Sequence, residues 1–225
     1  MNKLLIFIAL AAIAILSAHP VEANNFAYMS VFGGDFGTVD LTTGEFSKLG
    51  NSGQSLAGFG VANGILYATD FHTGIGTLYT VNPRDGSLTA VGDSSVNIDI
   101  FGSTTSGLFA VGIDANLYAI NPATGAATLI GPTGQAFGTW RTLSVNASKL
   151  YFANGTNLYT LNTTTGAATL VGDMGGLQLG SILMEGGVLY GGEETPTLEV
   201  DTLNTTTGKA TAKAAVSGTT NPFYA

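Results

Sequence analysis

The chain has 225 residues, a formal net charge of −8, and charged side chains at only 10% of its positions. Its 7 Lys and Arg residues are too few for the basic patch that nucleic-acid binding requires. It has no cysteine, which excludes disulfides, thiol catalysis and cysteine-ligated zinc.

The N-terminal residues 1–23 predict a secretory signal peptide. Lys3 precedes an apolar run from Leu4 to Leu16, and Val21-Glu22-Ala23 stands ahead of Asn24 as a small-residue cleavage site. The alternative is a retained N-terminal anchor, although the run is short for a membrane span. We therefore expect a mature chain of residues 24–225, secreted or periplasmic, with no membrane span after cleavage.

The remainder of the chain is organised around a repeat whose clearest copy is LYTLNTTTGAATLVG, residues 158–172. Each copy has an apolar and β-branched stretch, a turn ending in glycine, and a second short β-branched stretch, which is typical of a hairpin. The copies recur about every 40 residues, the interval of a repeat array. The equivalent turn glycines are Gly44, Gly86, Gly125, Gly166 and Gly208.

Two further strand-like segments precede each later hairpin. The first segments are 55–61, 98–103, 139–145 and 179–184, and the second are 65–69, 108–111, 150–153 and 188–191. Four strands in roughly 40 residues define the blade of a β-propeller. The sequence therefore predicts an all-β, five-bladed β-propeller of four-stranded blades over residues 24–225.

The two ends of the predicted propeller complement each other. The mature chain enters at Phe26 to Val31, which matches the second strand of a blade, so the first blade lacks its innermost strand. Asn221 to Ala225 stand where a sixth innermost strand would begin. We expect this C-terminal segment to fill the vacant position and close the ring as a monomer, which removes open sheet edges.

The segments LYTVNPRDG, LYAINPATGAATLIG and LYTLNTTTGAATLVG resemble the repeats of bacterial secreted β-propellers of the quinoprotein-like and YVTN-like broad class. The resemblance covers the chain from about Phe26 onward. That class includes families with no assigned activity, so the resemblance implies the fold and export rather than a reaction. No cofactor is predicted from it.

Two charged residues are predicted to meet near the axis. Alignment of the repeats places Asp99 and Arg141 at one position of the innermost strands of neighbouring blades, with the sole tryptophan, Trp140, beside Arg141 on the same strand. One interpretation is an ion pair that fills the channel. The other is a polar anchor for a ligand.

One face of the predicted propeller is acidic. The strand order of a blade places the loops between blades, and those between second and third strands, on the same face. These loops contain no Lys or Arg. Their carboxylates are Asp35, Asp70, Asp114, Glu193, Glu194, Asp93 and Asp173, and the only histidine of the mature chain, His72, lies on the rim.

This acidic mouth predicts attraction of a cationic partner or of calcium, for which carboxylate oxygens are suitable ligands. The calcium candidates are Asp35, Asp70, Asp93, Asp114 and Asp173. The alternative is that aspartate merely favours tight loops and that His72 is a solvated loop residue.

Two function classes follow. The first is a non-enzymatic binding module for a protein, glycan or cell surface, with Asp99, Arg141, Trp140, His72, Asp70 and Asp114 as its ligand-binding residues. The second is a glycosidase-like hydrolase or lyase, which needs two carboxyl groups facing one bond. The predicted inner strands offer Asp99 and, just beyond the far end of another, Glu185, so no catalytic residue is assigned.

Overall fold

The computed structural model describes residues 25–31, 33–70, 74–138, 140–145, 147–193 and 198–219. The predicted signal peptide, His72, Glu194 and the predicted closing segment Asn221 to Ala225 lie outside the described residues. The described residues form 19 strands and no helix. Accordingly, this part of the chain holds no helix with the length and apolar character needed to cross a membrane.

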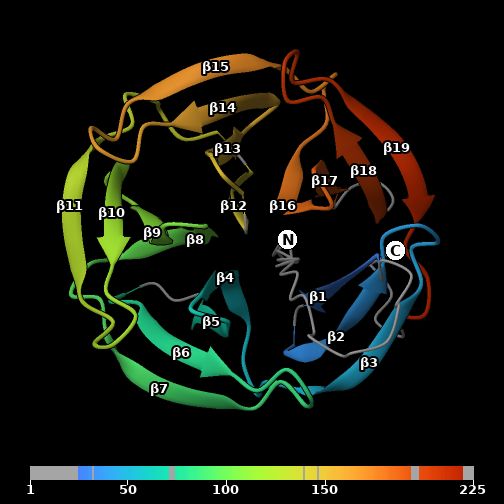
Figure 1. Cartoon of the computed structure of the whole chain (residues 1–225), viewed down its shortest axis with the longest axis horizontal. Coiled ribbons are helices and arrows are strands. Elements are labelled where there is room, and N and C mark those ends of the chain that lie inside the picture. Colours follow the sequence, from blue (N-terminus) through green and yellow to red (C-terminus); the bar gives the residue numbers. More distant parts are fainter. Residues whose placement is uncertain are drawn as a thin grey trace, which may run out of the picture.

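The strands form successive antiparallel meanders, in which each strand pairs with the next along the chain (Figure 1). The first comprises β1 (Phe26–Ser30), β2 (Asp35–Asp40) and β3 (Phe46–Asn51). The second comprises β4 (Leu56–Ala62), β5 (Ile65–Asp70), β6 (Thr77–Val81) and β7 (Leu88–Asp93), and the third β8 (Ile98–Thr104), β9 (Gly107–Gly112), β10 (Asn116–Ile120) and β11 (Ala127–Pro132). The fourth comprises β12 (Arg141–Val145), β13 (Leu150–Asn154), β14 (Asn157–Leu161) and β15 (Ala168–Asp173), and the last β16 (Leu179–Glu185), β17 (Val188–Glu193), β18 (Glu199–Leu203) and β19 (Ala210–Ala215).

The repeated hairpin forms as the sequence predicts. At the turn between β14 and β15, the Asn162 side chain accepts hydrogen bonds from the backbone N–H groups of Thr164 and Thr165 at 2.8 and 3.1 Å. Gly166 follows with a φ of 84°, a conformation that glycine adopts without steric cost. These local bonds fix the turn before any packing between meanders is made.

The meanders are arranged around a central axis (Figure 1). Strands β4, β8, β12 and β16 lie nearest the centre and β3, β7, β11, β15 and β19 on the outside. The apolar core is divided among the spaces between neighbouring meanders: Ile100 and Phe109 of the third, for example, pack with Leu143 and Phe152 of the fourth. The inner strands are therefore buried on both faces, which explains their near absence of charge, whereas the outer strands are largely exposed.

One strand pairing was not predicted. Inner strands β12 and β16 pair in parallel through Ser144 with Ile182 and Val145 with Leu183, which joins the last two meanders into an eight-stranded sheet. Inner strands converge on the axis, so neighbouring ones come close enough to exchange hydrogen bonds.

The last meander lies against the first. The carbonyl of Ser217 accepts a hydrogen bond from the N–H of Phe46 at 2.8 Å. The same contact joins consecutive meanders, for example from the N–H of Ala127 to the carbonyl of Ser94 at 3.1 Å. Within the described residues the first meander has three strands and no inner one.

Candidate functional site

The loops between meanders lie on the same face as the loops between second and third strands. Hydrogen bonds join the two kinds of loop: Met174 N–H donates to the Thr156 carbonyl at 2.8 Å and Thr133 N–H to the Ala115 carbonyl at 3.0 Å. The expected grouping of these loops is therefore confirmed. We call this face the loop face; the other carries the repeated turns.

The longest connection between meanders on the loop face is the β11–β12 loop, residues 133–140, whereas the corresponding connections are 52–55, 94–97 and 174–178. Asn154, at the end of β13 and only 7% exposed, holds this loop in place. Its side-chain nitrogen donates to the Ala136 carbonyl at 2.9 Å and its oxygen accepts from Gly138 N–H at 2.6 Å. A buried amide with both groups bonded fixes the path of an otherwise irregular segment.

Arg141 and Asp99 form the ion pair that the repeat alignment predicts. Arg141 Nε and a terminal guanidinium nitrogen donate to the two Asp99 oxygens at 2.6 and 2.7 Å. The guanidinium also donates to the Gly138 carbonyl at 2.6 Å and lies 4.3 Å from the ring centroid of Phe137. A bidentate, charge-assisted pair of this kind orients both groups, and here it also secures the β11–β12 loop. The ligand-binding role of the pair stays a prediction.

Trp140 differs in position from the prediction. The repeat alignment predicts Trp140 on the innermost strand, but β12 begins at Arg141, so Trp140 is the last residue of the loop. The Trp140 carbonyl accepts a hydrogen bond from Gly155 N–H at 2.8 Å, outside the regular ladder of β12 and β13. The indole is half-buried. Phe137, which the sequence did not single out, stands in the same loop.

The carboxylates of the loop face have partners of their own. Lys48 reaches from β3 to Asp35 at 2.7 Å, and this hydrogen bond lowers the pKa of Asp35. Burial opposes ionisation of Asp114, but hydrogen bonds from the Tyr118 hydroxyl and the Asn116 amide, both 2.7 Å, leave its pKa lowered. Both groups are therefore held in the ionised form.

The remaining aspartates follow the same pattern. Asp70 accepts from the N–H of Thr77 and Asp93 from its hydroxyl, each at 2.9 Å, and Asp173 accepts from Gly175 N–H at 2.6 Å. Each carboxylate thus shapes a nearby loop. Among the described residues no three His, Cys, Asp or Glu side chains are grouped as metal ligands, and the calcium hypothesis stays an untested prediction.

The two carboxylates considered for catalysis lie at opposite ends of their strands. Asp99 is near the start of β8 and Glu185 is the last residue of β16. The inner strands run in the same direction, and a seven-residue strand is about 20 Å long. Asp99 also forms an ion pair with Arg141. Asp99 and Glu185 therefore do not have the geometry of two carboxyl groups facing one bond.

A second acidic feature, in the last meander, escaped the sequence reasoning. Asp201 is fully buried, and neither of its carboxylate oxygens has a hydrogen-bond partner among the described residues. Burial, with the charge of Glu199, raises the pKa of Asp201 to about 6. Burial also raises the pKa of Glu193, which faces Glu199 across the strand pair. The sequence does contain a signal for this feature: in VDTLN, Asp201 takes the place of the tyrosine found in LYTVN and LYTLN of other repeats.

No protein-family model matches the chain, and no curated protein matches it. Several solved structures are similar to the chain. A structural genomics protein of unknown function from Bacteroides thetaiotaomicron VPI-5482 aligns with a TM-score of 0.63 at 15% identity, over 92% of this chain and 58% of that one. A chain of the nidogen/laminin complex aligns with a TM-score of 0.60 at 12% identity, over 94% and 80%.

Glutaminyl cyclase from Myxococcus xanthus aligns with a TM-score of 0.55 at 14% identity, over 77% of this chain and 79% of that one. Identities this low establish the fold alone. Together with the radial meanders of Figure 1, they define the class: this chain is an all-β propeller. The fold that the repeat resemblance implied is thereby confirmed.

Proposed function

We propose that this chain is an exported, non-enzymatic β-propeller of five blades that binds a basic protein partner through its loop face. Export follows from the predicted signal peptide at residues 1–23. The nidogen/laminin complex among the similar structures is compatible with a role in protein interaction.

The five-bladed architecture follows if each meander is one blade. Ser217 contacts the first meander as Ser94 and Thr133 contact the meanders that follow them. Ile98, the first residue of an inner strand, lies four positions after Ser94. The same spacing after Ser217 leads to Asn221, so Asn221 to Ala225 would be the inner strand that completes the first blade.

The observation that carries the binding proposal is the β11–β12 loop. It is the irregular element of a regular array, and insertions in repeat proteins commonly mark the binding face. Its Phe137 packs against Arg141 of the Asp99–Arg141 pair, Trp140 precedes Arg141 in the chain, and Asn154 holds the loop backbone. Pre-organised aromatic side chains lose little entropy on binding, which makes them effective contact residues.

Charge indicates the class of partner. Two loop-face carboxylates are neutralised, Asp35 by Lys48 and Asp99 by Arg141. Four others that are exposed or partly exposed form no ion pair within the described residues, and the described loops of this face contain no Lys or Arg. These four are Asp70, Asp93, Asp114 and Asp173. A surface of one sign accelerates encounter with a partner of opposite sign.

Trp140 offers a direct test because it is the only tryptophan of the chain. Titration with an oligolysine peptide should change its fluorescence, and the affinity should fall steeply as salt is added. An oligoglutamate peptide is the matched probe and should not bind. Phe137→Ala should weaken oligolysine binding. An unchanged signal with oligolysine at low salt, or equal binding of both peptides, would overturn the proposal.

A further inference from the structure

A polar hollow lies on the face opposite the loop face. It has a volume of about 450 Å³ and lies between the β8–β9 turn, the β12–β13 turn and the β14–β15 hairpin. Six of its lining residues are Thr104, Ser106, Ser148, Lys149, Thr160 and Thr164. The β8–β9 and β12–β13 turns follow inner strands that carry Asp99 and Arg141 at their other ends. The hollow is therefore remote from the Asp99–Arg141 pair and from the loop face.

The hollow is built by contacts between two meanders. Thr104 and Ala147 form a parallel bridge, and Thr105 N–H donates to the Ala147 carbonyl at 3.1 Å. The Thr104 and Ser106 hydroxyls share a hydrogen bond of 2.7 Å. The two turns therefore hold a fixed relative position, and their hydroxyl groups stand in a defined place.

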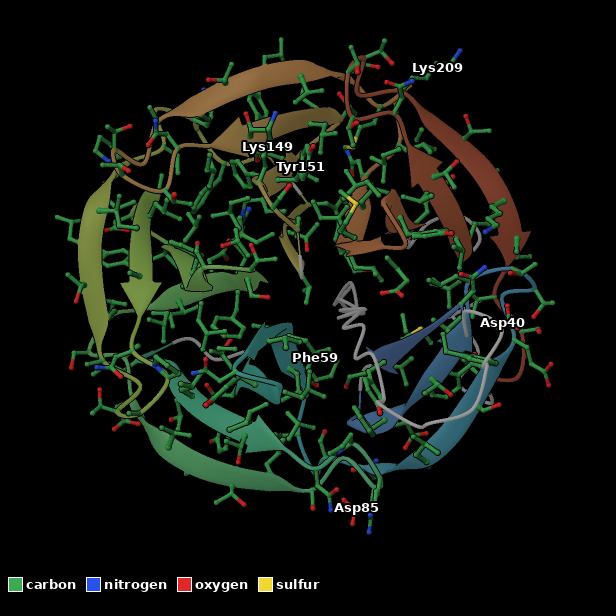
Figure 2. The ribbon with its side chains drawn as sticks, viewed as in Figure 1. Asp40, Phe59, Asp85, Lys149, Tyr151 and Lys209 are labelled. Atoms are coloured by element: carbon green, nitrogen blue, oxygen red, sulfur yellow. The ribbon has the colours of Figure 1, made fainter. Side chains whose placement is uncertain are left out.

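Its charge is opposite to that of the protein as a whole. The chain carries a net charge of −8, yet no carboxylate lines the hollow, and its one charged side chain is Lys149. Lys149 is exposed, and its ammonium has no ion pair or hydrogen bond within the described residues. Figure 2 shows Lys149 over the middle strands of its meander, whereas Lys209 lies at the outer rim.

Lining chemistry of this kind selects a polar anion. A lysine ammonium is a point-charge ligand for phosphate and carboxylate groups. Serine and threonine hydroxyls can both donate to and accept from ligand hydroxyls. The volume falls within the usual range for small-molecule sites, and it exceeds what a single inorganic anion would fill.

We propose that this hollow binds a sugar bearing one anionic substituent, with Lys149 contacting the anionic group and the surrounding hydroxyls contacting the ring hydroxyls. The site is independent of the loop-face proposal because it uses a different face and a ligand of opposite charge. Titration with a phosphate ester and with a carboxylate of the same sugar distinguishes which anionic group the site prefers.

Calorimetric titration of the full mature chain tests the site with glucose 6-phosphate, glucuronate, glucose and inorganic phosphate. We expect at least one anionic sugar to bind at low-millimolar concentration, roughly tenfold more tightly than glucose or phosphate. Lys149→Gln should lose that advantage. Lys209→Gln, which removes a lysine from another turn of the same face, should retain it, and Ser148→Ala should weaken binding without changing the fold.

Several results would overturn the assignment. The proposal fails if neither anionic sugar binds, or if phosphate alone binds as tightly as the sugar ester. It also fails if the Lys149 and Lys209 variants lose equal affinity for the anionic sugar. Lys149 is exposed, so its variant is expected to fold. A melting temperature equal to that of the wild type would verify this and leave the binding result decisive.

Discussion

Replacing Asp201 with asparagine should remove a pH dependence that is built into the last meander. Asp201 is fully buried, has no hydrogen-bond partner within the described residues, and has a pKa raised from 3.8 to about 6. The folded state therefore binds this proton more tightly than the unfolded state. The contribution to stability is complete below about pH 3.8 and is lost as the pH rises through about 6.

The magnitude follows from the size of the pKa shift. A pKa difference of about two units corresponds to roughly 3 kcal/mol of unfolding free energy. Asparagine cannot ionise, so the stability of Asp201→Asn relative to wild type should rise by roughly this amount between about pH 4 and about pH 8. Urea denaturation at a series of pH values measures the difference, in which titrating groups remote from Asp201 cancel.

Asp173→Asn provides the matched control, since it makes the same chemical change at the exposed end of β15. Its stability relative to wild type should lack this rise across about pH 4 to about pH 8. If the Asp201→Asn difference were flat with pH, or fell as pH rose, the assignment of a buried, unpaired carboxylate to the last meander would be wrong.

Three further predictions concern the ring and its loops. Gly125→Val should lower the free energy of unfolding by about 1 kcal/mol or more, and by more than Gly134→Val does. Both glycines have φ above 70°, but only at Gly125 would a side chain meet the backbone of the preceding meander. Equal effects of the two substitutions would contradict this prediction. Deleting Thr219 to Ala225 should cause aggregation or a large fall in melting temperature, and a stable monomer would remove the closure proposal. Calcium at millimolar concentration should give heat that is lost in Asp70→Asn/Asp114→Asn, and no heat would end the calcium hypothesis.

The sequence predicted features that depend only on repetition. The Asp99–Arg141 pair could be located because equivalent positions of neighbouring repeats must adjoin around an axis. The loop face could be assembled because strand order alone determines which loops share an end. Both arguments require the period and the order of strands, and neither requires a side-chain contact to be known.

Features that break the repetition could not be predicted in the same way. The path of the β11–β12 loop depends on Asn154, a residue that lies distant in sequence and whose amide could equally have faced solvent. The displacement of Trp140 from its strand follows from that path. The burial of Asp201 depends on how two meanders pack, although its substitution for a repeated tyrosine was visible in the sequence.

Amide hydrogen exchange with and without oligolysine tests the central claim, a binding face organised by the β11–β12 loop. We predict that the peptide increases protection in residues 133–138 and in the neighbouring loops 113–115 and 174–176. The repeated turns around Gly125 and Gly166, on the opposite face, should be unaffected. Protection confined to those turns, or no change anywhere at low salt, would contradict the account.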